Sequence, residues 1–129
     1  MQIHQSAEDY LETILMLSQR MGKVRSIDVV NELGFTKASV SIAMKKLREN
    51  GYIAVDGEGN LTLLEPGREI AERIYSRHRL LTHFFVQLGV EEDIAAEDAC
   101  KAEHILSEQT LEKIRESALR NDATHPQAK

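Results

Sequence analysis

The stretch SIDVVNELGFTKASVSIAMKKLRENGYIAVDGEGNLTLL, residues 26–64, decides the fold. It opens with two short segments whose apolar residues recur at helical spacing, joined by Gly34-Phe35, as in a helix-turn-helix. Two short apolar runs, 52–55 and 61–64, then flank a Gly-rich turn, which is typical of a β-hairpin. A hairpin that directly follows a helix-turn-helix predicts the wing of a winged-helix domain.

Outside this stretch the apolar pattern is helical throughout. We expect a first helix capped by Ser6 and ending at Gly22, and two helices in the core stretch, one capped by Ser26 and one by Thr36. Beyond Pro66 we expect helices over residues 66–88 and 91–106 and a last one capped by Ser107. The expected fold is mainly α: a winged helix-turn-helix DNA-binding domain over 1–64, an all-helical domain over 65–120, and a disordered tail over 121–129.

Composition narrows the class of protein. The chain has 129 residues and one cysteine, so it cannot form an internal disulfide. It has no apolar run near the roughly 18 residues of a membrane span and no secretory signal, so we expect a cytoplasmic protein without membrane contact. The net charge is −5, yet residues 20–55 hold seven basic and three acidic residues, a net +4. A basic segment in an acidic chain favours a local phosphate-binding surface.

The start of the helix over 36–50 is the expected DNA-reading face. Its inward positions are apolar, whereas its outward side chains are short or polar enough to approach base edges: Thr36, Lys37, Ala38, Ser39, Ser41 and Ile42. The residues expected to contact phosphates are Arg25, Lys37, Lys45 and Lys46. For Ser39 and Ser41, ordinary surface polarity explains the residue type about as well.

A second group of residues has the chemistry of a metal site. Cys100, Glu103 and His104 stand at i, i+3 and i+4, so a helix would turn all three to one face. Asp9 and Glu12 stand at i and i+3 on the first helix, and a histidine, His78, interrupts an apolar stripe. Each of these residues has an ordinary explanation when it is taken alone. Asp9 can be an acid at the start of a helix and Glu12 a solvated charge. Cys100 can be a small buried residue and His78 a hydrogen-bonded core histidine. Together they could fill a four- to six-coordinate transition-metal site.

Three motifs around the helix-turn-helix carry a family resemblance: SAEDYLE at 6–12, SRHRLL at 76–81 and DACKAEH at 98–104. In this order and spacing the chain resembles the diphtheria-toxin-repressor and manganese-transport-regulator family. The resemblance implies a homodimeric repressor that binds double-stranded operator DNA when loaded with Mn²⁺ or Fe²⁺ and controls metal homeostasis, with 65–120 as dimerisation and metal-binding domain. It implies these metal ligands: Asp9, Glu12, His78, Cys100, Glu103 and His104.

The chain combines features of both branches of this family. Glu12 matches the manganese branch, whereas Cys100 stands where the iron branch has its cysteine. Thr82 and Ala96 occupy positions at which relatives carry a further glutamate and histidine, so a second metal site of the iron type is not expected. The cognate metal therefore stays open between Mn²⁺ and Fe²⁺, with Co²⁺ or Zn²⁺ able to bind in vitro.

Three other functions were weighed. The first is a winged-helix regulator that responds to another ligand, with the metal-like residues merely structural. The second is a small metalloenzyme, which the sequence disfavours because it has no Gly-rich phosphate cradle and no α/β pocket pattern. The third is a metal buffer without DNA activity, which the +4 segment and the hairpin disfavour. We expect a regulator and not an enzyme.

Overall fold

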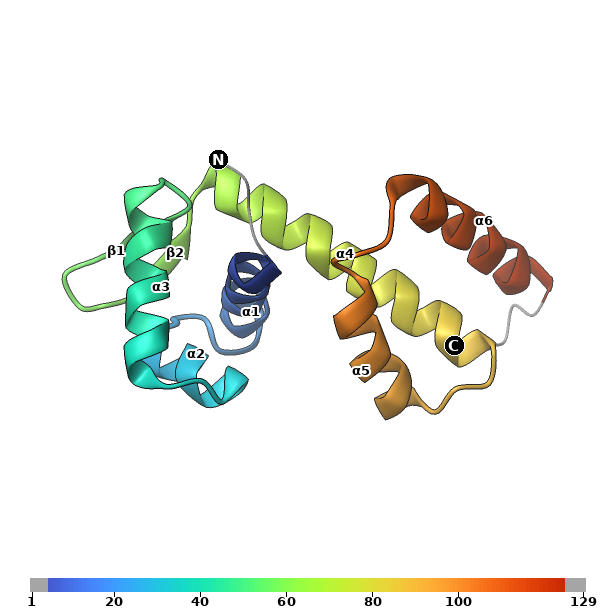
Figure 1. Ribbon diagram of the computed structural model, residues 1–129, viewed down its shortest axis with the longest axis horizontal. Helices are drawn as coiled ribbons and strands as arrows, with labels where there is room; N and C mark the ends of the chain where they lie inside the picture. The colour runs from blue at the N-terminus through green and yellow to red at the C-terminus, as the bar shows by residue number, and fades with distance from the viewer. Residues whose placement is uncertain (1–4, 125–129) are drawn as a thin grey trace. The chain divides into compact units, whose positions relative to one another are not determined.

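The secondary structure of this computed structural model is described for residues 5–124, and the chain divides into two units, residues 1–73 and 74–129. The first unit holds α1 (Gln5–Met21), α2 (Ser26–Leu33), α3 (Lys37–Glu49) and the hairpin of β1 (Ile53–Val55) and β2 (Leu61–Leu63). A long helix, α4 (Glu65–Gln87), begins in this unit and ends in the second, which also holds α5 (Glu92–Ala102) and α6 (Glu108–Thr124) (Figure 1). This is the winged helix-turn-helix followed by an all-helical region that the sequence predicts.

The helix-turn-helix is shaped by local capping. The hydroxyl of Thr36 accepts a hydrogen bond from the Ser39 amide at 3.1 Å, so Thr36 caps α3 as predicted. Gly34 ends α2 in the left-handed conformation, with φ of 72°. The start of α2 differs from expectation: the Asp28 carboxylate accepts from the Arg25 amide at 2.9 Å, so Arg25 and not Ser26 is the N-cap residue. An aspartate three residues into the helix provides a stronger acceptor than the serine.

The core of the first unit is built from the apolar face of each helix. The side chains that pack α1, α2 and α3 together are almost completely buried, and they include Leu11, Ile14, Val29, Val40 and Leu47. At about 1.5–3 kcal/mol for each large apolar side chain, their burial is the main term that holds the three helices together. It leaves the opposite face of α3 exposed to solvent.

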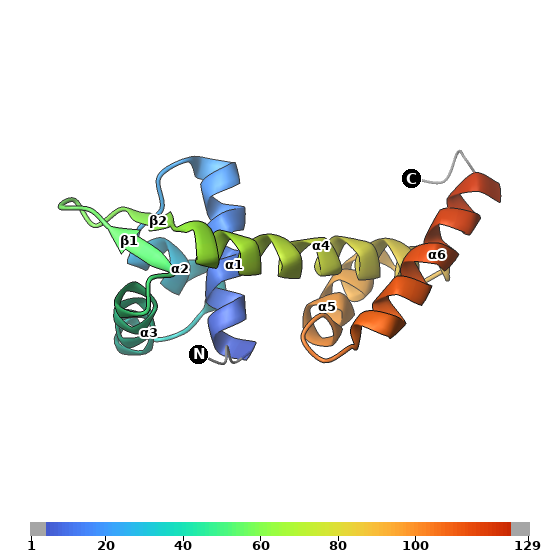
Figure 2. The same ribbon diagram turned by 90° about the horizontal axis from the view of Figure 1, so that it is seen from above.

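The hairpin is antiparallel, with Ile53 opposite Leu63 and Val55 opposite Leu61. A backbone hydrogen bond of 2.7 Å from the Leu61 amide to the Val24 carbonyl ties it to the segment before α2. Figure 2 shows the turn of the hairpin reaching out beyond α2 and α3 of the same unit. The sequence-predicted wing is therefore present and anchored at its base.

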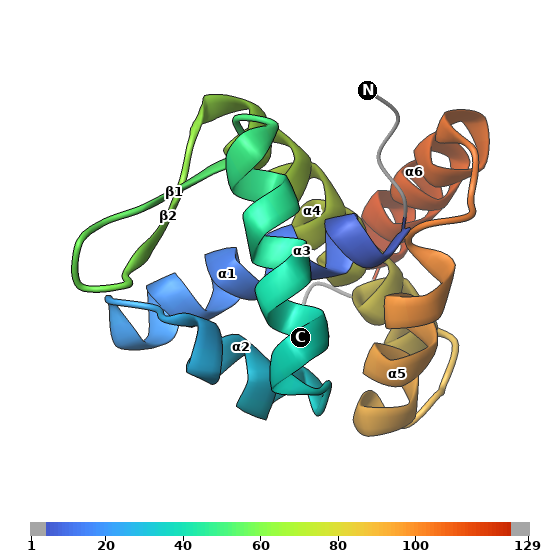
Figure 3. The same ribbon diagram turned by 60° about the vertical axis from the view of Figure 1, so that its left-hand side comes forward.

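In the second unit α5 and α6 pack against the later turns of α4 (Figure 3). The centre of this packing is formed by Leu81, Ala99 and Leu111, one from each helix, all fully or almost fully buried. The small Ala99 lets α5 approach α4 closely, which positions the last turn of α5 and the loop after it.

Other boundaries also differ from expectation: α1 already includes Gln5, so Ser6 lies inside this helix and is not its N-cap residue. Helix α5 ends at Ala102 rather than 106, because the Ile105 amide bonds the Ala102 carbonyl (3.1 Å) and closes a tighter turn. The first unit extends into α4, whose Arg73 pairs with Glu8 at 3.5 Å. Residues 121–124 are helical instead of disordered, since Asp122 bonds His83 at 3.0 Å and Gln87 at 2.7 Å, among other contacts. The rest of the expected tail, 125–129, lies outside the described residues, as do residues 1–4.

Candidate metal centre and nucleic-acid face

Three of the six sequence-predicted ligands meet inside the second unit. Glu103, just beyond α5, lies within contact distance of His78 on α4 and of its neighbour His104. One carboxylate oxygen of Glu103, Oε1, is 3.1 Å from Nδ1 of His78, and the other, Oε2, is 3.3 Å from Nε2 of His104. Glu103 is fully buried, and the side chain of His104 is only 2% exposed. The structure thus brings a buried carboxylate between two imidazoles.

The donor set of this cluster fits a divalent transition metal. A buried carboxylate is costly unless its charge is compensated, and among the described residues Oε2 of Glu103 has no hydrogen-bond partner. Imidazole nitrogens and carboxylate oxygens are the ligands that Mn²⁺ and Fe²⁺ accept in proteins. A cation held by these atoms would satisfy the charge that the protein leaves buried.

Asp9 and Glu12 belong to the first unit, one turn apart on α1. Glu12 is a buried acidic residue, 6% exposed, on the side of the helix that also carries apolar residues, and Asp9 is half-buried. Burial, and next to it the charge of Asp9, raises the pKa of the neighbouring Tyr10 hydroxyl. A buried glutamate in the middle of a helix is unusual for a purely structural helix, which marks this pair as chemically distinct.

The helix that carries Cys100 ends before Glu103 and His104, and whether the three side chains share one face stays a prediction. Cys100 is exposed on the last turn of α5, whereas Glu103 is buried and follows the helix as its C-cap residue. His104 lies in the turn beyond the helix, so the helical spacing of four residues does not place it. The helix expected over 91–106 stops at Ala102; Glu103 still has right-handed helical dihedrals, and the turn begins there.

The predicted reading face of α3 is arranged as expected. Val40, Met44 and Leu47 are buried, whereas the residues assigned to bases or phosphates on this helix and its cap are all exposed, namely Thr36, Lys37, Ala38, Ser39, Ser41, Ile42, Lys45 and Lys46. The hydroxyl of Thr36 also bonds that of Ser39 at 2.9 Å, so both belong to the helix cap. Whether each exposed residue contacts DNA stays a prediction.

Two basic groups at this face extend the sequence prediction. A cavity of about 250 Å³ between α2, α3 and the hairpin is lined partly by Lys45 and Arg48. Arg48 was missed, although its spacing of three residues from Lys45 places both on one side of a helix. The Arg25 guanidinium lies against Gly59 in the hairpin turn, so a cation stands beside a wing that has no basic residue of its own.

The acidic residue that opens the wing has a structural role. The carboxylate of Asp56 accepts hydrogen bonds from the amides of Glu58 and Asn60, both at 2.9 Å, and from the Asn60 side chain at 3.0 Å. These hydrogen bonds from Asn60, followed by those from its neighbours, lower the pKa of Asp56. The negative charge in the turn therefore shapes the hairpin.

In the part of the chain that the structure describes, no helix is both long and apolar enough to cross a membrane.

Comparison with known proteins gives a consistent result. A family model described as the N-terminal DNA-binding domain of iron-dependent repressors matches residues 2–61. A second model, described as the metal-binding and dimerisation domain of iron-dependent repressors, matches residues 64–127. The two matches together span nearly the whole chain, with their junction at the end of the hairpin.

Individual proteins agree with the family models. An uncharacterized HTH-type transcriptional regulator of Methanocaldococcus jannaschii is 35% identical over 113 residues, which is 86% of this chain and 90% of that protein. The HTH-type transcriptional regulator MntR of Bacillus subtilis is 33% identical over 109 residues, 84% of this chain and 77% of that protein. A manganese-dependent transcriptional repressor solved with manganese is 30% identical with a TM-score of 0.80; the match covers 87% of this chain and 52% of the solved one, about half its length.

Proposed function

We infer the function from the premise that this chain belongs to the family of iron-dependent repressors. We propose that it is a metal-activated transcriptional regulator, a homodimer in the cytoplasm that binds operator DNA when loaded with Mn²⁺ or Fe²⁺ and so controls metal homeostasis. The observation that carries the proposal is the buried carboxylate of Glu103 between the imidazoles of His78 and His104. The proposed role of His78, Glu103 and His104 is to bind a regulatory metal ion and not a substrate.

His78, Glu103 and His104 would hold the ion, and the remaining proposed ligands are Asp9, Glu12 and Cys100. When bound, a divalent cation would supply positive charge that neutralises the carboxylates and shifts the protein toward its DNA-binding conformation. Metal binding would in this way be coupled to operator binding. A coupling free energy of about 1–3 kcal/mol would change operator affinity by roughly 5- to 150-fold.

The proposed dimer would present two reading helices to one operator. Large apolar side chains are exposed on the second unit, among them Leu88 (65%), Ile105 (75%) and Leu119 (63%), which is consistent with a partner surface. In a two-fold dimer the two α3 helices must lie roughly 34 Å apart to enter successive major grooves. The exposed face of α3 would read bases there, while Arg25, Lys37, Lys45 and Lys46 would bind phosphates.

The proposal is tested with DNA binding under controlled metal supply. A duplex selected by the protein from a random-sequence pool in the presence of Mn²⁺ is the probe, and binding is measured in buffered Mn²⁺, Fe²⁺, Co²⁺ or Zn²⁺ under anaerobic reducing conditions. We expect tight binding with Mn²⁺ or Fe²⁺ that a chelator reverses. Binding that is indifferent to the chelator would favour a winged-helix regulator that responds to another ligand.

Removal of a phosphate contact should weaken all DNA binding alike. We expect Lys45→Ala to lower affinity for selected and unrelated duplexes by a similar factor, because a phosphate carries no sequence information. The slope of log affinity against log salt should fall by about 1, since one fewer counterion is released. The measurement is a salt titration in saturating Mn²⁺. The exposed Lys101, on α5, is the matched control, and an effect of Lys101→Ala equal to that of Lys45→Ala would contradict the assignment.

Exchange of the thiol should change metal preference. We expect Cys100→Glu to raise the affinity for Mn²⁺ relative to Co²⁺ and Zn²⁺, because a hard carboxylate oxygen replaces a soft thiolate. The ratio of the metal dissociation constants, measured by competition with a metal-binding dye, reports the change. The neighbouring Lys101→Glu adds the same kind of charge without removing the thiol and serves as control. An unchanged ratio in Cys100→Glu would exclude Cys100 from the ligands.

A further inference from the structure

The loop between α5 and α6 carries two of the proposed ligands outside regular helix. Glu103 is the C-cap residue of α5 and His104 lies in the following turn, so no helical backbone fixes His104. The loop is held at its end by Ser107, whose hydroxyl accepts from the Thr110 amide at 3.2 Å and so caps α6. A ligand-bearing loop of this kind needs further support if its side chains are to keep a fixed geometry.

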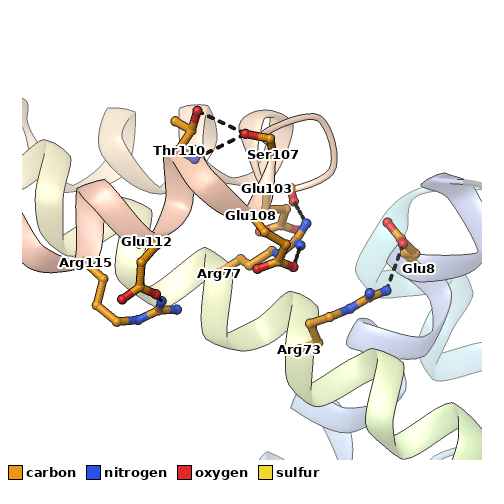
Figure 4. A network of polar contacts seen from close by, with 9 residues as sticks. All are labelled: Glu8, Arg73, Arg77, Glu103, Ser107, Glu108, Thr110, Glu112 and Arg115. Carbon is orange, nitrogen blue, oxygen red and sulfur yellow. Dashed lines mark hydrogen bonds and ion pairs between the residues drawn. The ribbon is translucent and has the colours of Figure 1, made fainter.

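Arg77 on α4 contacts both ends of this loop. Its Nη1 donates a hydrogen bond to the backbone carbonyl of Glu103 at 3.1 Å, and its Nη2 pairs with the carboxylate of Glu108 at the start of α6. Figure 4 shows the guanidinium between these two groups. The side chain of Arg77 is only 13% exposed, whereas that of Glu108 is 77% exposed, so solvent screens the bond to the Glu103 carbonyl less than it screens the ion pair with Glu108.

We propose that Arg77 is a positioning residue of the metal site, which holds the loop 103–107 so that the Glu103 and His104 side chains converge with His78. This inference rests on the proposed function. Arg77 directly precedes His78 in the sequence, so the same turn of α4 presents one ligand and fixes the backbone of another. Groups that orient metal ligands in this way typically contribute about 10- to 100-fold to metal affinity.

The planar fork of the guanidinium suits this task better than an ammonium would. Two of its nitrogens reach two acceptors at once, one backbone carbonyl and one carboxylate, in a fixed relative direction. A lysine at position 77 carries the same charge but concentrates it at one atom. Arg77→Lys should therefore keep part of the effect, whereas Arg77→Met keeps an unbranched, mostly apolar side chain and loses both contacts.

A simple interhelical ion pair is the competing explanation, and the chain supplies a matched control for it. Arg115 pairs with Glu112 at 2.7 Å on α6, three residues apart and exposed (Figure 4). Exposed ion pairs of this kind contribute little to stability. If Arg77 were no more than such a pair, Arg77→Met and Arg115→Met would have the same small effect on metal binding.

The experiment measures Mn²⁺ affinity of the full chain by the paramagnetic resonance signal of free Mn²⁺, together with the absorption spectrum of the Co²⁺-loaded protein. We expect Arg77→Met to weaken Mn²⁺ binding by about 10- to 100-fold and to change the Co²⁺ bands, because the ligand geometry relaxes. Arg77→Lys should lie between wild type and Arg77→Met, and Arg115→Met should bind within about twofold of wild type.

Unchanged Mn²⁺ affinity and Co²⁺ bands in Arg77→Met, with normal wild-type binding, would overturn the positioning role and leave the proposed function intact. A wild-type protein that binds none of Mn²⁺, Fe²⁺ and Co²⁺ would overturn both. If Arg77→Met fails to fold, the Mn²⁺ affinity of Glu108→Gln is measured in its place. This variant keeps the hydrogen bond from Arg77 to the Glu103 carbonyl and removes the ion pair between Arg77 and residue 108. An Mn²⁺ affinity lower than that of Arg115→Met supports the inference, and an equal affinity overturns it.

Discussion

Glu103→Gln is expected to abolish metal-stimulated DNA binding while it leaves a folded protein. The glutamine has nearly the same shape as the glutamate, so packing is kept, but the negative charge between the two histidines is lost. Because Glu103 contacts both imidazoles, we expect metal affinity to fall by more than the roughly 100-fold that is the upper range for a supporting residue. The measurement is Mn²⁺ affinity together with Mn²⁺-dependent retention of a selected DNA duplex.

The same substitution should affect stability in two opposite ways. Without metal, removal of a buried charge lessens the desolvation cost, so the free energy of unfolding should be unchanged or slightly higher than that of wild type. With metal, wild type gains about 2.7 kcal/mol at a metal concentration 100 times its dissociation constant, and the variant should gain almost none. Glu97→Gln, an exposed change on α5, should behave as wild type in both conditions. Metal-induced stabilisation that survives in Glu103→Gln would exclude Glu103 as a ligand.

The elements that were predicted correctly have strong local signals. The cap Thr36, the terminator Gly34 and the buried stripe of Val40 and Leu47 place α3 and the turn before it almost to the residue. The reason is that capping hydrogen bonds and apolar spacing depend on residues that are close together in the sequence, so the sequence alone predicts them. The exposed face of α3, and with it the candidate reading surface, follows directly.

The ligand set of the candidate metal centre stays a prediction, whereas the expected course of the helix that carries part of it is wrong. The sequence places Cys100, Glu103 and His104 on one helix over 91–106, yet α5 ends at Ala102 and Glu103 is its C-cap residue. That end is set by a turn closed at Ile105 and by the distant Arg77, whose bond to the Glu103 carbonyl spans 26 residues. Long-range contacts of this kind leave no periodic signal, so a sequence can suggest candidate ligands and still misplace the end of the helix that carries them.

Gly67→Ala is expected to destabilise the first unit, although alanine is the better helix former by about 1 kcal/mol. Gly67 lies in the first turns of α4, where an added Cβ would stand 2.2 Å from the backbone carbonyl oxygen of Tyr52. That oxygen also accepts the hydrogen bond from the Leu64 amide at 3.0 Å, which closes the base of the hairpin next to α4. Because the clash is with backbone, relief requires movement of the chain between α3 and β1.

The expected net loss is about 2–3 kcal/mol in the free energy of unfolding, the upper range for overpacking, which outweighs the helix propensity of alanine. Chemical denaturation in chelator measures it without a metal contribution, and amide exchange at Leu64 should accelerate most, because its acceptor is the group displaced. Gly57→Ala is the matched control: nothing lies within 4 Å of its Cβ, so stability should stay within about 1 kcal/mol of wild type. If Gly67→Ala equalled Gly57→Ala in both measurements, the close approach of α4 to Tyr52 would not be a determinant of the wing, and the hairpin would be held by its other contacts, such as the bond from the Leu61 amide to the Val24 carbonyl.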